Sequence, residues 1–287
     1  MQDSYTLDKA RVRASFDRAA RGYDAAAILQ KEVHARMLAR LDLIKIAPEG
    51  ILDAGAGTGH AVRALAERYP DSRIVALDIA LGMLRQSEAG QAWWRKWVGK
   101  AESSVCADIE QLPLASQSMD FIWSSLAIQW CNDLDATFAG MARVLRPDGL
   151  LMFSTFGPDT LKELRIAANA DPGHVHVSRF IDMHDIGDAL VRNGFAAPVL
   201  DVEHFVLTYD DVLGVMRDLQ AIGARNAAQG RRRGLEGKGF LQRLTGNYER
   251  FRRDGKIPAT FEVVYGHAWK APAPSLPADV SPIRLHR

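Results

Sequence analysis

Apolar and polar positions change their period along the chain. From about residue 50 to residue 156, short apolar runs alternate with segments whose apolar side chains repeat at helical spacing. Such alternation is typical of β-α units that form a parallel sheet. One helix is expected at Gly59–Arg68, and Pro70 ends it. Strands are predicted at Ile51–Asp53, Arg73–Asp78, Ser104–Ala107, Phe121–Ser124 and Leu150–Thr155. The pattern therefore predicts an α/β fold.

The flanking segments have a different pattern. Residues 7–42 are predicted to be helical, with a break at Arg21–Asp24, and Pro147–Gly149 is predicted to form a turn before the fifth strand. Residues 271–287 contain four prolines and few apolar side chains, so we expect this tail to be disordered. Between them the pattern predicts helices at Asp159–Ala168, Asp182–Asn193 and Asp210–Ile222, and strands at Val202–Thr208 and Glu262–Trp269.

Composition argues against several classes of protein. Hydrophobic residues make up 47% of the chain and charged residues 25%, which is ordinary for a globular protein. The two cysteines, Cys106 and Cys131, form no C-x-x-C pair, and His174 and His176 have no evident third ligand, so no metal site is predicted. No apolar run approaches the roughly 20 residues that cross a bilayer. We expect a soluble, cytoplasmic protein that binds no membrane.

The sharpest local signal is a glycine-rich turn, Leu52–Gly59, between a strand and a helix. Glycines Gly55, Gly57 and Gly59 allow the backbone to turn tightly and to approach a ligand. Dinucleotide enzymes use G-x-G-x-x-G at this place, whereas the spacing here is G-x-G-x-G, with Asp53 before the first glycine. A carboxylate there suits a ligand with an amino group and a sulfonium better than a diphosphate. A glycine-rich turn without a ligand is the alternative.

Two further acidic residues follow predicted strands. Asp78 ends the second strand, 25 residues beyond Asp53, about where an acid binds a ribose in such folds. It could also cap the following helix. Asp108 follows the third strand and could accept a hydrogen bond from an adenine amine, with Ile109 against the ring; a simple turn residue is the alternative.

These three signals, in this order and at these spacings, resemble class I S-adenosylmethionine-dependent methyltransferases over residues 50–156. The resemblance implies a Rossmann-like, seven-stranded, mainly parallel sheet with an N-terminal helical lid and a C-terminal helical insertion. Across residues 9–270 the chain also resembles the malonyl-[acyl-carrier-protein] O-methyltransferases of biotin synthesis. The motifs of this narrower resemblance are Phe16–Ala20, Tyr23-Asp24, Ser124–Trp130, Asn132–Leu134, Arg146–Gly149, Ser178–Phe180 and Leu219–Ala224.

The resemblance implies a division of the chain and a reaction. Residues 1–45 would form the lid and residues 46–270 the methyltransferase domain, with a basic insertion at about 210–256. The reaction is methyl transfer from S-adenosylmethionine to the free carboxyl group of a malonyl thioester on acyl carrier protein. The methyl ester masks a charge, so that fatty-acid enzymes can extend the chain toward pimeloyl. A malonyl carboxylate is ionised at neutral pH, so the reaction needs no general base.

The same resemblance assigns residues around the reacting groups. Tyr23 would close over the cofactor, although a turn with its ring in the core is the alternative. Gln129 and Trp130 would face the substrate, and Trp130 could equally be core packing. Arg179 would bind the malonyl carboxylate, since a guanidinium matches a carboxylate with two hydrogen bonds; a surface arginine is the alternative. Cofactor contacts are further implied for Met83 and Ser125.

The C-terminal third has a basic bias that the net charge of +1 conceals. Between Arg217 and Lys256 there are eleven Lys or Arg residues against four Asp or Glu. Such a segment, which includes Arg231, Arg232 and Arg233, attracts an acidic partner such as acyl carrier protein. Nucleic acid would be attracted as well, but no aromatic side chains alternate with the basic ones, so we expect none to bind. A solvated helix face is the simpler interpretation.

Three other functions compete with carboxyl methylation. Phe156–Leu161 and Ile257–Thr260 resemble the methyltransferase-like complex I assembly factors that hydroxylate an arginine. A small-molecule or quinone methyltransferase is a second possibility, although the basic segment has no use in it. A non-catalytic protein that binds the cofactor is the third. The oligomeric state is not predicted.

Overall fold

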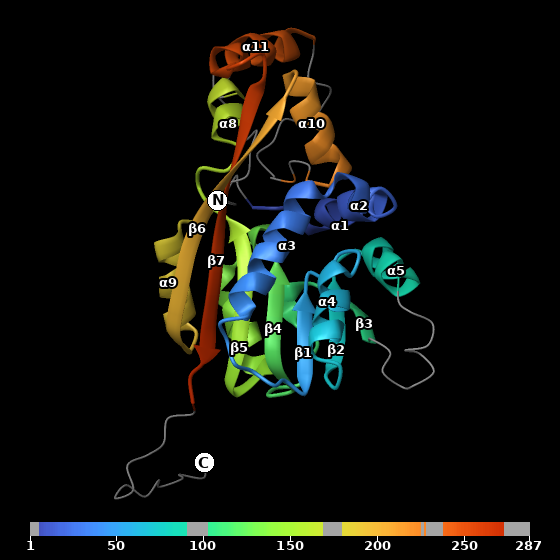
Figure 1. Ribbon diagram of the computed structural model, residues 1–287, viewed down its shortest axis with the longest axis vertical. Helices are drawn as coiled ribbons and strands as arrows, with labels where there is room; N and C mark the ends of the chain where they lie inside the picture. Colours follow the sequence, from blue (N-terminus) through green and yellow to red (C-terminus); the bar gives the residue numbers. More distant parts are fainter. Residues whose placement is uncertain (1–5, 91–102, 169–179, 225–226, 228–237, 273–287) are drawn as a thin grey trace, which may run out of the picture.

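The computed structural model describes residues 6–90, 103–168, 180–224, 227 and 238–272. A seven-stranded sheet in the order β3-β2-β1-β4-β5-β7-β6 forms its centre (Figure 1). The five strands from β3 to β5 are parallel, and β7 runs antiparallel to both β5 and β6. The strands are β1 Gly50–Ala54, β2 Arg73–Asp78, β3 Ser103–Cys106, β4 Met119–Ser125, β5 Leu145–Phe156, β6 Phe195–Tyr209 and β7 Ile257–Lys270. The prediction of a seven-stranded, mainly parallel sheet is confirmed.

Helices cover both faces of this sheet, because its central strands are apolar on both sides. On one face, α3 (Ile28–Leu41) and α4 (His60–Arg68) pack Val33 and Leu65 into the core around Trp123. On the other, α7 (Leu134–Val144) and α9 (Met183–Arg192) bury Phe138 and Leu190. The remaining helical segments are α1 Lys9–Ala19, α2 Tyr23–Ala26, α5 Leu81–Ala89, α8 Lys162–Ala168, α10 Val212–Ala221, α11 Lys238–Tyr248, η1 Ile109–Gln111, η2 Ile128–Trp130 and η3 Glu249–Phe251.

Strands β5, β6 and β7 begin at least five residues earlier than the sequence predicts. β6 and β7 pair along their full lengths, from Phe195 opposite Lys270 to Tyr209 opposite Ile257. Together they extend beyond the other strands and carry α8, α10 and α11, a part of the molecule that we call the upper lobe (Figure 1). The expected turn at Pro147–Gly149 lies inside β5, where the register with β4 shifts. Asp148 has a positive φ of 61° there, so this segment interrupts the apolar alternation that reveals a strand.

Helices α1, α2 and α3 confirm the predicted N-terminal helical segment. The helix is interrupted at residues 20–22 and at Ala27, whereas the break was predicted at Arg21–Asp24. Asp8 caps α1 by accepting a hydrogen bond from the backbone N–H of Arg11 at 3.2 Å. Figure 1 shows α1 and α2 lying across the edge at which the parallel strands end, and α3 running down one face of the sheet. We refer to α1 and α2 as the lid.

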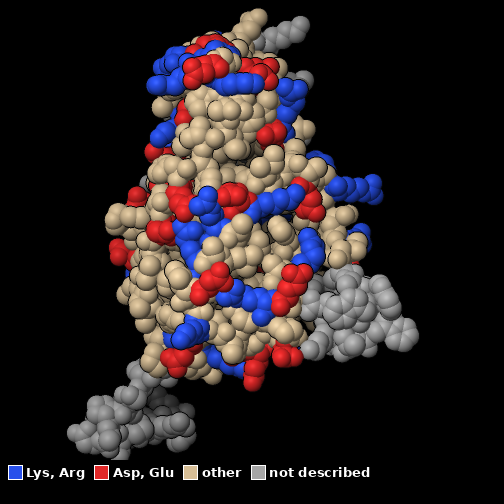
Figure 2. Space-filling model, viewed as in Figure 1, with Lys and Arg blue, Asp and Glu red and all other residues tan. Residues whose placement is uncertain are grey.

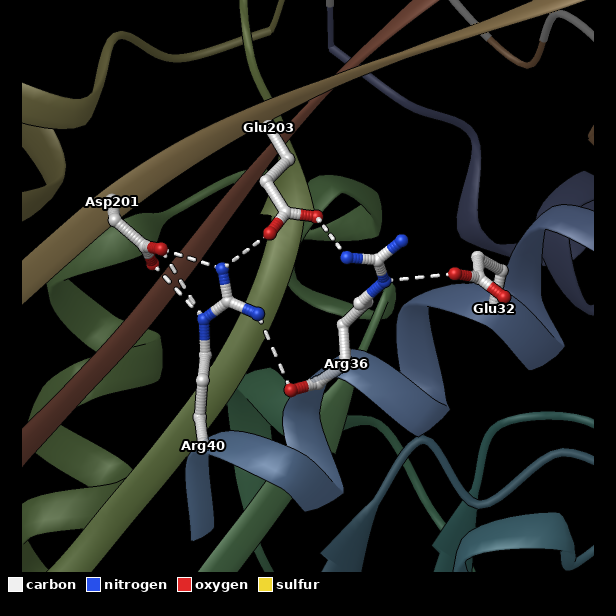
Figure 3. A network of polar contacts seen from close by, with 5 residues as sticks. All are labelled: Glu32, Arg36, Arg40, Asp201 and Glu203. Atoms are coloured by element: carbon white, nitrogen blue, oxygen red, sulfur yellow. Dashed lines mark hydrogen bonds and ion pairs between the residues drawn. The ribbon is translucent and has the colours of Figure 1, made fainter. Parts of the chain in front are cut away.

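Charged side chains fix α3 to the outermost strand (Figure 3). The guanidinium of Arg40 donates to Asp201 Oδ2 at 2.5 Å and to Glu203 Oε1 at 2.9 Å, and it lies 3.9 Å above the ring of Tyr265. Glu203 is also 3.9 Å from Arg36, one turn earlier on α3. The lid is therefore connected to a helix that is itself held firmly on the sheet. Among the described residues, no helix has the length and apolarity to span a membrane.

Candidate cofactor and active site

A pocket lies where β1, β2, β3 and β4 end, beneath helix α1. We call it the first chamber; its empty volume is about 610 Å³. The carboxyl ends of parallel strands meet at one edge, which is where such sheets bind ligands. Nine of the residues that the sequence singles out line it: Tyr23, Gly55, Gly57, Asp78, Met83, Asp108, Ile109, Ser125 and Trp130.

A second chamber of about 510 Å³ lies between the glycine-rich turn and helices α2 and α3. Asp53 lines it, as does Thr58 from the glycine-rich turn. The residues that both chambers share are Tyr23, Gly55, Gly57 and Ser125. The two chambers therefore form adjoining parts of one elongated site, with Tyr23 at their junction.

The three glycines of the turn have different roles. Each has a positive φ: 93° at Gly55, 54° at Gly57 and 77° at Gly59. A Cβ at Gly55 would lie 2.3 Å from Ala127, and one at Gly59 would lie 2.0 Å from Ser87 Oγ. No described atom lies within 4 Å of a Cβ at Gly57. Gly55 and Gly59 are thus required by packing, and Gly59 lines neither chamber, whereas Gly57 faces open space.

Asp78 joins two of the loops at this edge. Its Oδ2 accepts a hydrogen bond from Gly57 N at 2.9 Å and its Oδ1 one from Ala80 N at 2.8 Å. The residue is only 8% exposed. Burial raises the pKa of its carboxyl group to about 6, although the two N–H donors partly oppose this shift. The N-cap of α5 is Ala80, so Asp78 stabilises the loop before that helix and does not cap it directly.

Asp108 is held between the lid and η1. Its Oδ1 accepts a hydrogen bond from Glu110 N at 3.1 Å, which caps η1, and its Oδ2 lies 3.0 Å from Lys9 Nζ on α1. Lys9 also forms an ion pair with Glu110. The turn role considered from sequence is therefore present, and the lid contact was not predicted. Ile109 is 8% exposed at the wall of the first chamber.

Two of the three predicted catalytic residues, Tyr23 and Trp130, line the first chamber. Tyr23 begins α2, and burial together with the carboxylates of Asp78 and Asp24 raises the pKa of its phenol, which therefore stays protonated. Trp130 lines the first chamber and makes an edge contact with Phe16 of the lid, with ring centroids 5.2 Å apart.

Gln129 lies in neither chamber. Its Nε2 donates to Leu126 O at 2.6 Å, and its Oε1 accepts from Thr155 Oγ1 at 3.3 Å. Both ends of the amide thus hold the loop after β4. Gln129 therefore has a visible structural contact and is not brought together with Tyr23 and Trp130.

Several predicted features lie outside the described residues. These are the substrate-binding candidates Arg179, Arg231, Arg232 and Arg233, the pair His174 and His176, and the tail from residue 273 onward.

Four polar residues of the second chamber were not identified from sequence: Gln30, Lys31, His34 and His60. A signal for two of them exists. Gln30 and His34 are four residues apart on α3 and therefore share a helix face. That face also carries Val33 and Met37, both fully buried. Polar side chains within a buried helical stripe indicate either an internal hydrogen bond or a ligand.

Comparison with known proteins decides the family. The family model described as a methyltransferase domain matches residues 52–153. The malonyl-[acyl-carrier protein] O-methyltransferase of Methylovorus sp. (strain MP688) is 64% identical over 99% of this chain and 96% of its own length. The enzyme of that name from Gallionella capsiferriformans (strain ES-2) is 57% identical over 96% of each chain. This chain belongs to the malonyl-[acyl-carrier protein] O-methyltransferase family.

The solved structures agree with the fold of this methyltransferase. The YcgJ protein of Bacillus subtilis superposes with a TM-score of 0.56 at 17% identity, over 84% of this chain and all of its own. The Rossmann-like class I methyltransferase fold is thereby confirmed. The resemblance stated from the sequence motifs is also confirmed, and the arginine hydroxylase alternative is not favoured.

The cofactor of such methyltransferases is S-adenosylmethionine. The residues present fit this molecule. Each chamber has a buried carboxylate, Asp78 in the first and Asp53 in the second, at 8% and 1% exposure. An elongated ligand with two hydroxyl groups at one end and an ammonium at the other matches that arrangement. At Gly57 the open space leaves room for the ligand to lie against the backbone.

Proposed function

We propose that this methyltransferase transfers the methyl group of S-adenosylmethionine to the free carboxyl group of a malonyl thioester carried on acyl carrier protein. The relatives that match nearly the whole chain are named for that substrate. The structural observation that supports the proposal most directly is the pair of adjoining chambers, which meet at Tyr23 beneath the lid. The product is a malonyl methyl ester, which the family resemblance relates to pimeloyl and biotin synthesis.

In this proposal the first chamber binds the adenosine end of the cofactor. Each carboxylate oxygen of Asp78 accepts one N–H and has capacity for a second donor, so both can accept ribose hydroxyls. Asp108 would accept a hydrogen bond from the adenine amine, and Ile109 would pack against the adenine ring. Met83 and Ser125 line the same chamber and would contact the cofactor there. Bound in this way, the cofactor supplies an electrophilic methyl group.

The acceptor carboxylate needs no general base because it is already ionised at neutral pH. Tyr23 is unsuited to act as a base, since its pKa is raised further above the usual value near 10. What remains for the enzyme is to align the carboxylate oxygen and to exclude water. Phe16 and Trp130 support this role because their edge contact closes the first chamber between the lid and η2. Tyr23 lies at the junction of the two chambers, beside the position proposed for the methyl group.

Basic side chains are proposed to recognise the malonyl group and its carrier protein. Arg179 remains our candidate for the malonyl carboxylate, by its position in a motif shared with the family. Figure 2 shows Lys and Arg side chains, with some acidic ones among them, over the end of the upper lobe that holds α11. Arg250 and Arg253 are exposed there. A basic surface at that end would attract an acidic carrier protein by long-range steering.

The segments that resemble the complex I assembly factors have a structural explanation. Leu161 N donates to Thr260 O at 2.6 Å, and Glu163 accepts a hydrogen bond from Thr260 N at 3.0 Å. A Cβ at Gly157 would lie 2.5 Å from the carboxyl carbon of Glu262. The two segments therefore pack on each other to join α8 to β7, and their likeness to the assembly factors needs no hydroxylase activity.

A transfer assay tests the proposed function. The purified enzyme is incubated with S-adenosylmethionine labelled in the methyl group and with malonyl-ACP. We expect label on the carrier protein that mild base releases as volatile methanol, which distinguishes a methyl ester from label freed by hydrolysis of the thioester. Acetyl-ACP, which lacks the free carboxyl group, is the matched control and should acquire no label. Label that resists base, or equal labelling of acetyl-ACP, would overturn the proposal.

A further inference from the structure

The second chamber is lined by side chains of opposite charge that come from β1 and α3. Asp53, at the end of β1, is 1% exposed. Lys31 is on α3, and its Nζ donates to the backbone carbonyl of Asp24 at 2.6 Å. Both residues line the chamber. A ligand that carries an ammonium and a carboxylate within one small group would match both charges.

His34 lies on the same wall as Lys31. It is 4% exposed, and its Nε2 is buried without a hydrogen-bond partner among the described residues. Its ring stacks on that of His60 with centroids 4.7 Å apart and meets Trp123 edge-on at 5.2 Å. A buried polar nitrogen without a partner destabilises a fold unless a ligand completes it. Here the ring is held in place by its aromatic neighbours, yet one nitrogen is left unpaired.

Both imidazoles are uncharged at neutral pH. Burial, then the nearby His60 and Arg63, lower the pKa of His34 to about 4, and burial also lowers the pKa of His60. His34 can therefore donate one N–H to a ligand without bringing a second positive charge to the chamber. The charge that balances a carboxylate comes from Lys31.

We propose that His34 and Lys31 bind the α-carboxylate of the cofactor, while Asp53 binds its α-ammonium. This rests on the assignment of adenosine to the first chamber in the proposed function. With adenosine there, the rest of an extended ligand passes Tyr23 and reaches the second chamber, which adjoins the first at the glycine-rich turn. His60 acts as a positioning residue, because its ring holds that of His34. Neither histidine takes part in methyl transfer.

Two ligands separate this role from a structural one. S-adenosylhomocysteine has the amino-acid end, whereas 5′-methylthioadenosine shares its adenosine and sulfur but lacks that end. His34→Phe keeps an aromatic ring in the stack and removes the nitrogen. Calorimetry should show S-adenosylhomocysteine affinity lowered at least tenfold in this variant. Methylthioadenosine affinity should change less than twofold.

Lys31→Met gives an independent test, because Lys31 is exposed and its replacement leaves the core intact. It should produce the same selective loss. Lys45→Met, at an exposed lysine after α3, should change neither affinity. Equal losses on both ligands, or an unchanged affinity for S-adenosylhomocysteine, would overturn the assignment. Wild-type enzyme that binds neither ligand would instead overturn the cofactor site of the proposed function. These binding measurements contain no malonyl-ACP, so their outcome does not depend on whether malonyl-ACP is the methyl acceptor.

Discussion

Asp78 combines burial with an expected ligand contact, so we expect cofactor affinity to depend on pH. Ribose hydroxyl groups donate to the ionised carboxylate, so binding lowers a pKa that burial has raised to about 6. Binding therefore releases a proton below pH 6. Affinity for S-adenosylhomocysteine should rise as pH increases toward 6 and level off above it, about tenfold weaker at pH 5 than at pH 7.

Calorimetry across this range measures the effect. Asp78→Asn cannot lose a proton, so the variant should bind more weakly at pH 7 and show a flatter profile. Asp17 and Tyr23 are the other titratable groups near Asp78. A profile in the variant as steep as that of the wild type would assign the titration to another group.

Gly57 offers a test of the ligand's approach to the backbone. Gly57→Val adds a side chain to space that is open among the described residues. The left-handed conformation should cost roughly 1–2 kcal/mol of stability. Affinity for S-adenosylhomocysteine should fall by at least tenfold while the protein remains folded by circular dichroism. Gly140→Ala, on α7 with no described atom within 4 Å of its new Cβ, is the control and should bind normally. Unchanged affinity in Gly57→Val would exclude the turn as a contact.

Some site residues could be predicted from the sequence and others could not, for a physical reason. The glycine-rich turn, Asp78 and Asp108 follow parallel strands, whose carboxyl ends must meet at one edge. His34 comes from a helix that approaches this edge from elsewhere, and its position depends on packing that a local pattern does not specify. Gln129 follows a strand as well, but its side chain turns back to Leu126 and Thr155. The direction of a side chain in a short 3-10 turn could not be predicted.

The lid contacts the segment after each of the strands β1, β2 and β3 through a charged side chain. Asp24 Oδ1 accepts from Thr58 Oγ1 at 2.5 Å in the loop after β1. Asp17 Oδ1 accepts from Gly82 N at 2.7 Å, after β2. Lys9 pairs with Asp108 after β3. Because these segments also contribute residues to the first chamber, we expect that some of the contacts must break before the cofactor leaves.

Removing one contact should therefore speed ligand release. Asp17→Ala loses a hydrogen bond of about 1 kcal/mol, so the dissociation rate of S-adenosylhomocysteine should increase roughly fivefold. Stopped-flow displacement measures this rate. Asp185→Ala, an exposed carboxylate in the first turn of α9, should leave the rate unchanged. An identical rate in wild type and Asp17→Ala would show that the lid does not limit release.

The charge network of Figure 3 should contribute modestly to stability. Glu203 pairs with both arginines of α3 and is 31% exposed in its side chain. Glu203→Gln should lower the free energy of unfolding by about 1 kcal/mol at low salt and by less at 1 M NaCl, where charges are screened. Urea denaturation measures both values. Glu49, 85% exposed beside Arg146, provides the control: Glu49→Gln should have almost no effect. A salt-independent loss would contradict an electrostatic role.

For the whole molecule, the sequence predicted the parallel part of the sheet better than the upper lobe. Strands β1, β2 and β4 are buried almost throughout and give short apolar runs. β6 lies at the edge, with exposed and partly buried residues alternating from Ala196 to Tyr209, so only its more apolar second half was identified. The pairing of β6 with β7 joins residues from Phe195 to Lys270. Such distant pairing cannot be inferred from local patterns.

The upper lobe is where we expect the carrier protein to dock. Replacing Arg250 and Arg253 by Glu should lower kcat/KM for malonyl-ACP at least fivefold and leave malonyl-CoA nearly unaffected, because steering acts mainly on association. The difference should shrink at high ionic strength. Replacing Lys45 and Arg73 by Glu is the matched control. Both residues are exposed, Lys45 before β1 and Arg73 at the start of β2, and this equal change of charge should not discriminate between the substrates. Equal losses on both substrates would indicate a folding defect instead.

We propose that the enzyme methylates an acceptor that is already ionised and so uses no general base. The most direct test of this proposal is kcat for malonyl-ACP between pH 7 and 9, with S-adenosylmethionine saturating. Asp78 is ionised throughout this range, and the raised pKa of Tyr23 keeps that phenol protonated. We expect a flat profile. A rate that rises tenfold per pH unit over part of the range would show a base losing its proton, and catalysis without a general base would then be wrong.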